Sequence, residues 1–291
     1  MSAAEKITIA TFADRRRKGE VITVLTAYDY MTARLLDECG IDAVLVGDSL
    51  AMVMLGYQNT LSVTLEEMLH HIRAVRRGVS RALLIGDLPF MSYQVSESQA
   101  VRNAGRLVQE GGVQAVKLEG GSDMASTVRA IVRAGIPVQG HIGLTPQSIN
   151  IFGGWKVRGR TAKDASRLLN DALCLEEAGC FSIVIEGVPS QVAGHITERL
   201  SIPTIGIGAG ADTSGQVLVI HDVLGLSEQI RPRFAKRYAD LGLKIKEAAS
   251  TYKQEVLARA FPSIEHTYTM AAEEWHLFLN THGASPEPRD S

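Results

Sequence analysis

The sequence predicts an α/β protein: a (β/α)8 TIM barrel with an extra N-terminal helix and C-terminal helices. Eight short apolar, β-branched runs end abruptly in polar or glycine residues, and helical stretches lie between most of them. Runs that are continuously apolar are typical of parallel strands buried on both faces. Eight strand–helix units within 291 residues favour a closed barrel over an open, doubly wound sheet.

The expected strands share an apolar interior and a polar or glycine end. They are Val21–Asp29, Ala43–Ser49, Leu83–Phe90, Ala115–Gly120, Pro137–Thr145, Ser182–Val188, Pro203–Gly210 and Gln216–Ile220. The expected connecting helices are Tyr30–Cys39, Thr64–Arg77, Ser96–Gln109, Asp123–Ala134, Ala162–Ala178 and Ser190–Arg199. Only Ala211–Gly215 separates the last two strands, although a parallel crossover normally needs about a dozen residues. Either this helix is vestigial or the eighth strand is misplaced.

The whole chain, 1–291, is expected to form a single barrel domain, with the barrel over about 20–232. A helical extension over 233–284 and a frayed tail over 285–291 would follow it. Ile9–Lys18 looks like a short helix that could close the bottom of the barrel. Arg233–Ala260 is interpreted as one or two C-terminal helices.

Composition is that of a soluble enzyme, with 45% apolar and 21% charged residues. The net charge of −2 gives no reason to expect nucleic acid or an anionic membrane as a partner. No apolar stretch approaches the roughly 20 residues that span a bilayer, and no signal peptide is recognisable. Three scattered cysteines, Cys39, Cys174 and Cys180, are interpreted as reduced and mostly buried thiols. We therefore expect a cytoplasmic protein.

Ionisable residues stand at the ends of six successive expected strands. They are Asp29, Asp48, Asp87, Lys117 with Glu119, His141 and Glu186. In barrels of this type the reaction centre is built from the carboxyl ends of the strands. Because burying carboxylates is unfavourable without a cation or a hydrogen-bond network, this set predicts an active site at one mouth of the barrel.

Asp48, Asp87 and Glu119 come from three adjacent strands, so their carboxylates can converge on one metal ion. A ligand set made only of oxygen atoms suits Mg²⁺ or Mn²⁺ rather than zinc. The competing interpretation is that the aspartates cap the helices that follow them. For Asp48 alone, the capping role and the metal-binding role are about equally supported, whereas for the three carboxylates together capping is the weaker interpretation.

Three further side chains have candidate roles in catalysis. Lys117 shares a strand face with Glu119, and it could neutralise a substrate carboxylate or an enolate, or form an ion pair with an aspartate. Glu186 follows an apolar run, which suits a general base for a weakly acidic C–H, or it could be a carboxylate bonded to backbone amides. His141 could hydrogen-bond the substrate or act as the base instead.

The segment Thr145–Arg160 is long for a strand–helix connection, and it holds Trp155 between a glycine pair and basic residues. Long ordered loops at this face of a barrel are often lids or cofactor contacts. We therefore expect the segment to contribute to the mouth.

Seven stretches together resemble the 3-methyl-2-oxobutanoate hydroxymethyltransferase (ketopantoate hydroxymethyltransferase) family. They are Thr26–Tyr30, Leu45–Ser49, Asp87–Met91, Val116–Gly121, Gly140–Ser148, Asn150–Gly154 and Ile205–Gly210. The resemblance covers about Ile22 to Lys236, and no site position departs from the family pattern. The tail after Phe261 lies outside it.

The resemblance implies a folate-dependent transferase of pantothenate biosynthesis, with 5,10-methylenetetrahydrofolate as the one-carbon donor to a branched 2-oxo acid. It implies one Mg²⁺ per subunit on Asp48, Asp87 and Glu119, and a decamer of two five-membered rings. It places Ser49 and Lys117, with the two aspartates, on the substrate, and it makes Glu186 the proton acceptor. The metal would stabilise the enolate as a Lewis acid.

Two other functions fit the same pattern. A lyase or phosphonomutase of the phosphoenolpyruvate mutase and isocitrate lyase type also places Mg²⁺ and 2-oxo acids at a barrel mouth. A non-catalytic barrel that serves as a scaffold is the other, but a scaffold has no use for so unfavourable a cluster of charges.

Overall fold

Eight parallel strands close into a barrel in the first of two units of the chain, Met1–Asp240, while the second unit is Leu241–Ser291. The computed structural model describes residues 5–226 and 232–283. The expectation of a single domain over 1–291 stays a prediction.

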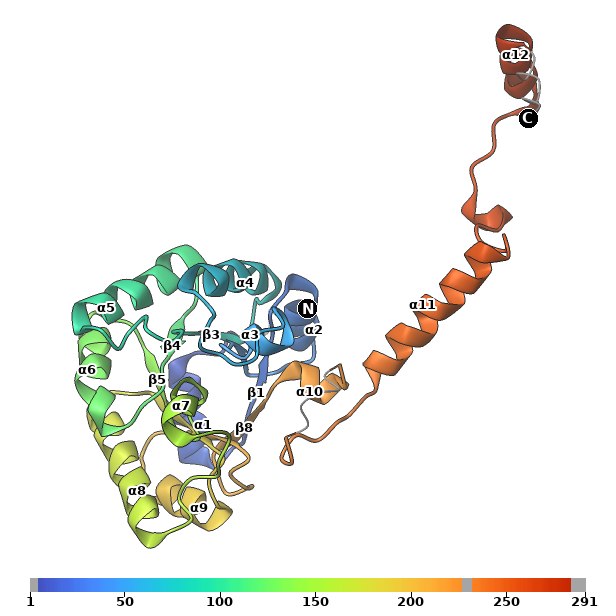
Figure 1. The fold of residues 1–291 in the computed structure, drawn as a ribbon. Helices are drawn as coiled ribbons and strands as arrows, with labels where there is room; N and C mark the ends of the chain where they lie inside the picture. The colour runs from blue at the N-terminus through green and yellow to red at the C-terminus, as the bar shows by residue number, and fades with distance from the viewer. Residues whose placement is uncertain (1–4, 227–231, 284–291) are drawn as a thin grey trace. The chain divides into compact units, whose positions relative to one another are not determined.

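The barrel has the strand order of the chain, with β8 returning to pair with β1 (Figure 1). The strands are β1 Ile22–Thr26, β2 Ala43–Val46, β3 Leu83–Asp87, β4 Ala115–Lys117, β5 Val138–Gly143, β6 Ser182–Glu186, β7 Thr204–Ile207 and β8 Gly215–Leu218. Every neighbouring pair is parallel. The predicted (β/α)8 barrel is therefore confirmed.

Six helices that connect the strands lie on the outer side of the barrel, as Figure 1 shows. They are α2 Tyr30–Glu38, α4 Leu65–Gly78, α5 Glu97–Arg106, α6 Ala125–Arg133, α8 Ala162–Glu177 and α9 Ser190–Arg199. A π-helical turn, Leu107–Gly111, continues α5, and short helices α3 Leu50–Val53, α7 Ile149–Phe152 and α10 Ile220–Leu224 follow β2, β5 and β8. All six connecting helices expected from the sequence are present.

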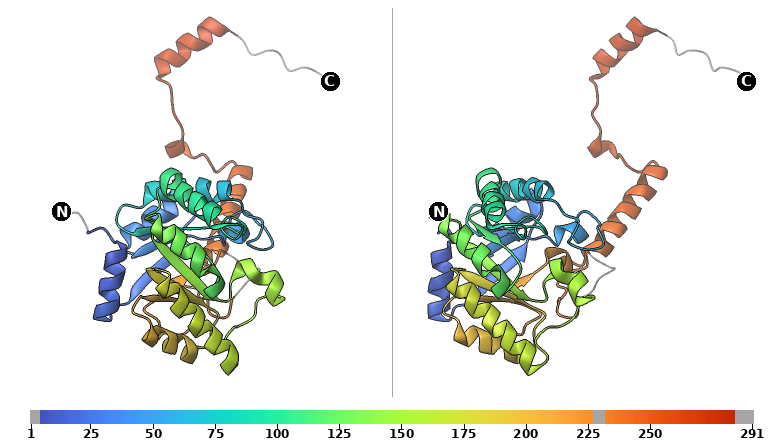
Figure 2. Two further views of the ribbon diagram at one scale, coloured as in Figure 1. Left: turned by 90° about the vertical axis from the view of Figure 1, so that its left-hand side faces the viewer. Right: turned by 60° about the vertical axis from the view of Figure 1, so that its left-hand side comes forward.

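Apolar side chains fill the barrel and separate it from its helices. Inside, Val24, Leu45 and Ile85 belong to one buried cluster, which also includes Phe12 of α1 Ile9–Lys18. The Phe12 ring lies edge-on to Phe181 at 5.8 Å between centroids. Helix α1 thus closes the amino-terminal end of the barrel, as expected, and Figure 2 shows it at the opposite end from α7.

The connection between β7 and β8 contains no helix, because only residues 208–214 separate the two strands. Strand β8 nevertheless pairs with both β7 and β1. The eighth strand is therefore correctly predicted, and the doubtful helix is absent from this described stretch. The strand ends at Leu218, and Ile220, predicted to belong to it, instead begins α10.

Strands β1 and β2 stop before the aspartates that the sequence assigned to their ends, Asp29 and Asp48, whereas β3 and β6 include Asp87 and Glu186. Asp29, for example, lies after β1 and accepts a hydrogen bond from the Thr32 backbone as the N-cap of α2. A capping side chain needs extended backbone just outside the helix, so it cannot remain in the sheet ladder. Asp29 is therefore a helix cap and not a member of the reaction centre.

The second unit contains α11 Leu241–Leu257, a single 3-10 turn at Ile264–His266, and α12 Ala272–His282. The helix expected over Arg233–Ala260 thus begins eight residues later than predicted, since Pro232–Asp240 is not helical. The predicted tail 285–291 lies outside the described residues. Within the described residues, no helix has the length and apolarity needed to cross a membrane.

The three cysteines differ in burial. Cys180 is buried, Cys174 is half-buried, and Cys39 is exposed because it ends α2 at the surface. The expectation of mostly buried thiols holds for Cys180 alone.

Candidate active site

Asp87 and Lys117 form a buried ion pair at the mouth of the barrel. They are direct partners in the register of β3 and β4, and Lys117 Nζ lies 2.6 Å from Asp87 Oδ2. Their side chains are 1% and 4% exposed. An ion pair so deeply buried needs further polar partners, because desolvation offsets much of the attraction between the charges.

Asp48 joins this pair from the end of β2. Its backbone N–H donates to Asp87 Oδ2 at 3.2 Å, so the two aspartates lie at the same end of the barrel. The next residue, Ser49, occupies the N-cap position of α3, and neither side chain caps that helix. The capping interpretation is therefore wrong for Asp48.

Glu119, His141 and Glu186 form the second part of the site. His141 Nδ1 lies 3.4 Å from Glu119 Oε1, and His141 Nε2 lies 3.3 Å from Glu186 Oε2. Both are charge contacts without the alignment of a good hydrogen bond. The imidazole thus stands between the two carboxylates, and Glu186 keeps 13% of its side chain exposed toward solvent.

Gln147 connects the two parts of the site, and the sequence analysis did not single it out. Its side-chain amide donates to Asp48 Oδ2 at 3.0 Å, and its backbone N–H donates to Glu119 Oε2 at 2.9 Å. Its amide oxygen accepts from the Tyr93 hydroxyl at 2.7 Å. Both Gln147 and Tyr93 are uncharged and lie outside the strands, so the search for ionisable strand ends passed over them.

Ser49 lies beside the site with a second tyrosine that sequence reasoning missed. The hydroxyl oxygens of Ser49 and Tyr28 are 2.8 Å apart. Burial raises the pKa of Tyr28, so the phenol remains protonated at neutral pH. Tyr28, which is fully buried, therefore orients the Ser49 hydroxyl.

The protonation of the site follows from its crowding. Burial raises the pKa of Asp48 well above its usual range, and the charges of Asp87 and Glu119 raise it further. Burial also raises the pKa of Asp87, but its 2.6 Å contact with Lys117 is that of an ion pair. We therefore assign the site's excess proton to Asp48. Burial acts in the same direction on Glu119, where contacts with His141 and other donors outweigh it and lower the pKa.

His141 carries a positive charge in this setting. Burial and the Lys117 cation act to lower its pKa, but contacts with Glu119 and Glu186 outweigh them and raise the pKa to about 9. Four carboxyl groups, of which Asp48 is protonated, thus face two cations. They are Asp48, Asp87, Glu119 and Glu186 against Lys117 and His141.

The donor set suits a hard divalent cation. Asp87 Oδ1 and Glu119 Oε1 are buried and accept no hydrogen bond, and an excess of carboxylates remains. Among the described residues, no three His, Cys, Asp or Glu side chains are gathered closely enough to hold a metal unaided. Mg²⁺ commonly uses only one or two carboxylates, with water and substrate completing its shell. The residues therefore fit a Mg²⁺ ion that the protein and a chelating substrate hold jointly.

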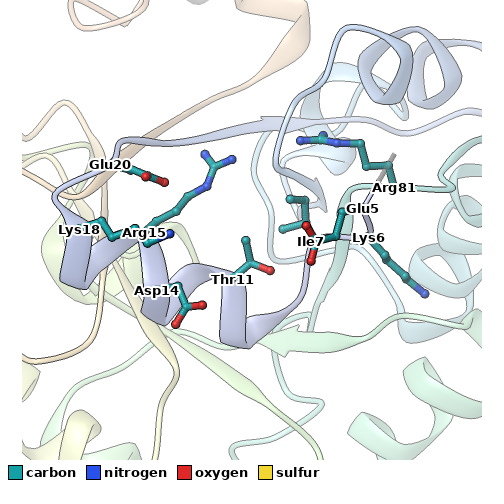
Figure 3. A pocket seen from close by; sticks show the side chains of 9 residues that line it. All are labelled: Glu5, Lys6, Ile7, Thr11, Asp14, Arg15, Lys18, Glu20 and Arg81. Carbon is teal, nitrogen blue, oxygen red and sulfur yellow. The ribbon is translucent and has the colours of Figure 1, made fainter. Parts of the chain in front are cut away.

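A separate cavity of about 430 Å³ lies at the amino-terminal end of the barrel, beside α1 (Figure 3). Arg15 and Arg81 line it, and both already contact Asp42, at 2.7 and 3.5 Å. Because it lies at the opposite end of the barrel from the mouth that holds Asp87 and Lys117, this cavity is not the reaction centre.

The fold and the mouth together define a barrel enzyme whose acidic centre suits proton abstraction beside a carbonyl group. A family model described as ketopantoate hydroxymethyltransferase matches residues 6–264. The chain belongs to this family. Proteins named 3-methyl-2-oxobutanoate hydroxymethyltransferase are similar to it over most of its length. That of Syntrophobacter fumaroxidans is 60% identical over 87% of this chain and 90% of its own, and that of Carboxydothermus hydrogenoformans is 53% identical over 92% and 98%.

Solved structures of other barrels resemble the fold. A 2,3-dimethylmalate lyase of the phosphoenolpyruvate mutase/isocitrate lyase superfamily has a TM-score of 0.57 with 16% identity, covering 98% of both chains. A phosphonopyruvate hydrolase has a TM-score of 0.56 with 12% identity, covering 95% of this chain and 96% of its own. At this identity the likeness shows the shared fold and not a shared reaction.

Proposed function

We propose that the protein transfers a one-carbon unit from 5,10-methylenetetrahydrofolate to 3-methyl-2-oxobutanoate, forming 2-dehydropantoate for pantothenate and coenzyme A biosynthesis. Membership of the ketopantoate hydroxymethyltransferase family carries this proposal. The cluster of buried carboxylates and one lysine at the barrel mouth supports it, because a small 2-oxo acid carries a negative charge and an acidic C–H. A lyase of the neighbouring superfamily is the weaker candidate, since those proteins share only the fold.

Asp48, Asp87 and Glu119 are the proposed residues for one Mg²⁺ per subunit. A bound Mg²⁺ would supply a Lewis acid for the keto oxygen of the substrate. The unpartnered oxygens of Asp87 and Glu119 support this assignment.

Lys117 and Ser49 are proposed to hold the oxo acid. The Lys117 ammonium offsets the carboxylate of the substrate while remaining bonded to Asp87. The Ser49 hydroxyl, positioned by Tyr28, donates to a substrate oxygen. Asp48 and His141 would line the same site.

Glu186 is proposed to take the proton from C3 of the substrate. Its contact with His141 orients the carboxylate, and its partial exposure at the mouth leaves it accessible to the substrate. The electron pair of the broken C–H bond forms the enolate, and this carbon then bonds to the methylene carbon of the folate. Water cleaves the two C–N bonds that hold the methylene carbon, so that its oxygen becomes the new hydroxyl oxygen and its two protons go to the nitrogens of the released tetrahydrofolate. The proton held by Glu186 passes to the alkoxide that forms with the new C–C bond.

Exchange of the C3 proton with deuterated solvent tests this proposal without any folate. The wild-type enzyme with Mg²⁺ should wash out the C3–H signal of 3-methyl-2-oxobutanoate in proton NMR. Glu186→Gln should lose the exchange and keep substrate binding, while Glu198→Gln, an exposed residue on α9, should retain both. Exchange that survives in Glu186→Gln would exclude Glu186 as the base.

A homodecamer of two pentameric rings remains part of the proposal. Apolar side chains of α2, Met31 and Leu35, are each 52% exposed, and exposed apolar patches often mark subunit contacts. Light scattering that gave the mass of a monomer would exclude the decamer. The cytoplasmic location stays a prediction.

A further inference from the structure

The connection between β5 and α8, residues 144–161, is attached to the reaction centre at two points. Near its start, the backbone N–H of Gln147 donates to Glu119 at 2.9 Å. Near its end, the backbone N–H of Arg158 donates to the carbonyl of Gly187, which follows Glu186, also at 2.9 Å. The residues between these points, including α7, therefore stand at the mouth, at the end opposite α1 (Figures 1 and 2).

Apolar side chains on this connection point to solvent. Ile151 is 85% exposed, Trp155 50% and Val157 44%. Phe152 lies beneath the Arg158 guanidinium, 4.4 Å from it. A single exposed apolar side chain is ordinary, but a group of them often marks a binding site. Beside a reaction centre such a group is typical of a region that contacts a ligand.

The same segment is strongly basic although the chain as a whole has a net charge of −2. Between Ile149 and Lys163 there are four cations and no acidic residue. Lys156, Arg160 and Lys163 are exposed, and within residues 5–226 and 232–283 they have no hydrogen-bond or ion-pair partner. Unpaired cations beside an exposed indole ring suit a ligand that is both flat and anionic.

We propose that residues 149–163 bind the folate co-substrate. This inference rests on the proposed function, which requires a donor with a flat bicyclic ring and a glutamate tail that carries carboxylates. Trp155 and its apolar neighbours contact the ring system, and Lys156, Arg160 and Lys163 attract the carboxylates of the tail. The two attachments to Glu119 and Gly187 hold the segment where the methylene carbon can reach the enolate at the acidic centre.

A charge-removal variant separates this inference from the proposed function. Lys156→Ala/Arg160→Ala/Lys163→Ala should raise the KM for the folate about tenfold, and more for a polyglutamyl folate than for the monoglutamate. Added salt should shrink the difference from wild type, because exposed charges are screened. The kcat and the folate-free exchange of the C3 proton should not change, since the oxo acid binds elsewhere.

Arg102→Ala/Arg129→Ala/Arg133→Ala is the matched control. It removes three exposed cations from α5 and α6 that likewise have no partner in the described part of the chain. The control should leave the KM for the folate unchanged. An equal rise in both triple variants, or no rise in the loop variant, would overturn the inference.

Fluorescence gives a readout without turnover. The chain has two tryptophans, so Trp155 is the sole tryptophan in a Trp275→Phe background, and excitation at a wavelength that tyrosine does not absorb reports on it alone. Tetrahydrofolate should quench this emission beyond the absorption correction that free tryptophan provides, and the loop variant should need more ligand. Absence of quenching would overturn the inference, and a lower oligomeric mass of the loop variant would instead assign the segment to a subunit contact. Loss of folate-free exchange in the wild type would overturn the proposed function independently.

Discussion

The side-chain amide of Gln147 donates to Asp48 Oδ2 at 3.0 Å. An uncharged residue thus orients the carboxyl group whose pKa burial and neighbouring charges raise well above its usual range. The same residue restrains Glu119 through its backbone N–H. Two acidic residues, one just after β2 and one just after β4, are thus both hydrogen-bonded by a single residue outside the barrel strands. Partners of this kind around a metal site typically contribute 10- to 100-fold to metal affinity.

Gln147→Leu should therefore weaken Mn²⁺ binding by roughly 10- to 100-fold, measured by titration calorimetry. The substitution leaves Asp48 Oδ2 without its donor and the Tyr93 hydroxyl without its acceptor. Exchange of the C3 proton should fall in parallel and recover partly at high metal concentration. Gln191→Leu, at an exposed position on α9, is the control. Unchanged Mn²⁺ affinity in Gln147→Leu would leave Gln147 with a purely structural role.

Lys117→Met should destabilise the metal-free protein by about 3–5 kcal/mol at neutral pH, because it leaves Asp87 buried without its cation. Without the ammonium, the pKa values of Asp87 and Asp48 should rise further. Their protonation then restores part of the stability as the pH falls, so the deficit is largest at neutral pH and smaller in acid.

Urea unfolding at several pH values measures this deficit. Lys18→Met, an exposed change at the end of α1, should differ little from wild type at any pH. A deficit for Lys117→Met that stayed constant with pH would argue against an unpaired buried carboxylate as its cause.

Asp37 should contribute to stability far from the active site. Its carboxylate accepts hydrogen bonds from the backbone N–H groups of Ser80, Arg81 and Ala82, which joins α2 to the segment before β3. Burial acts to raise its pKa, but these bonds outweigh burial and hold the pKa below its usual value. Asp37→Asn should cost about 3 kcal/mol at pH 7, because an amide nitrogen then faces a backbone donor.

The sign of the pH dependence follows from the lowered pKa. The contribution of ionised Asp37 is fully present above its unfolded pKa of about 4 and is lost as the pH falls through the lower folded value. The gap between wild type and Asp37→Asn should therefore narrow below about pH 4. Asp212→Asn, at an exposed position, supplies the comparison in the same urea series. A gap that widened in acid would contradict this assignment.

The barrel was predictable because its signals are local. The helix Ser190–Arg199 has its predicted bounds, and the ionisable residues at the ends of β2 to β6 gather at one mouth. Asp29 shows the limit of that logic, since it follows β1 in the same way and yet caps α2. Only the path of the backbone after the strand distinguishes a cap from a site residue.

The supporting residues were not predictable from such signals. Gln147 acts across 99 residues of sequence to reach Asp48, and nothing in its neighbours marks that contact. Its one signal is its place in Gly140–Ser148, a stretch that carries the family resemblance. Tyr93 and Tyr28 were missed for a related reason: buried aromatic residues usually belong to the core, and only their hydroxyl partners show otherwise.

Asp48→Asn should raise the stability of the metal-free protein at neutral pH while removing its response to Mg²⁺. Burial and two neighbouring carboxylates raise the pKa of Asp48, so its ionisation opposes folding above its ordinary pKa, and the neutral amide avoids that cost. The gain should shrink in acid, where Asp48 is protonated in both folded and unfolded chains.

In wild type, Mg²⁺ should raise the melting temperature by mass action, because binding stabilises the folded state by about 2.7 kcal/mol at 100 times the Kd, and a chelator should reverse the rise. Asp87→Asn and Glu119→Gln should also lose this response if both carboxylates bind the ion, whereas Asp164→Asn on α8 should keep it. If Mg²⁺ raised the melting temperature of Asp48→Asn as much as that of wild type, the cation would bind elsewhere, because this variant lacks only the Asp48 carboxylate.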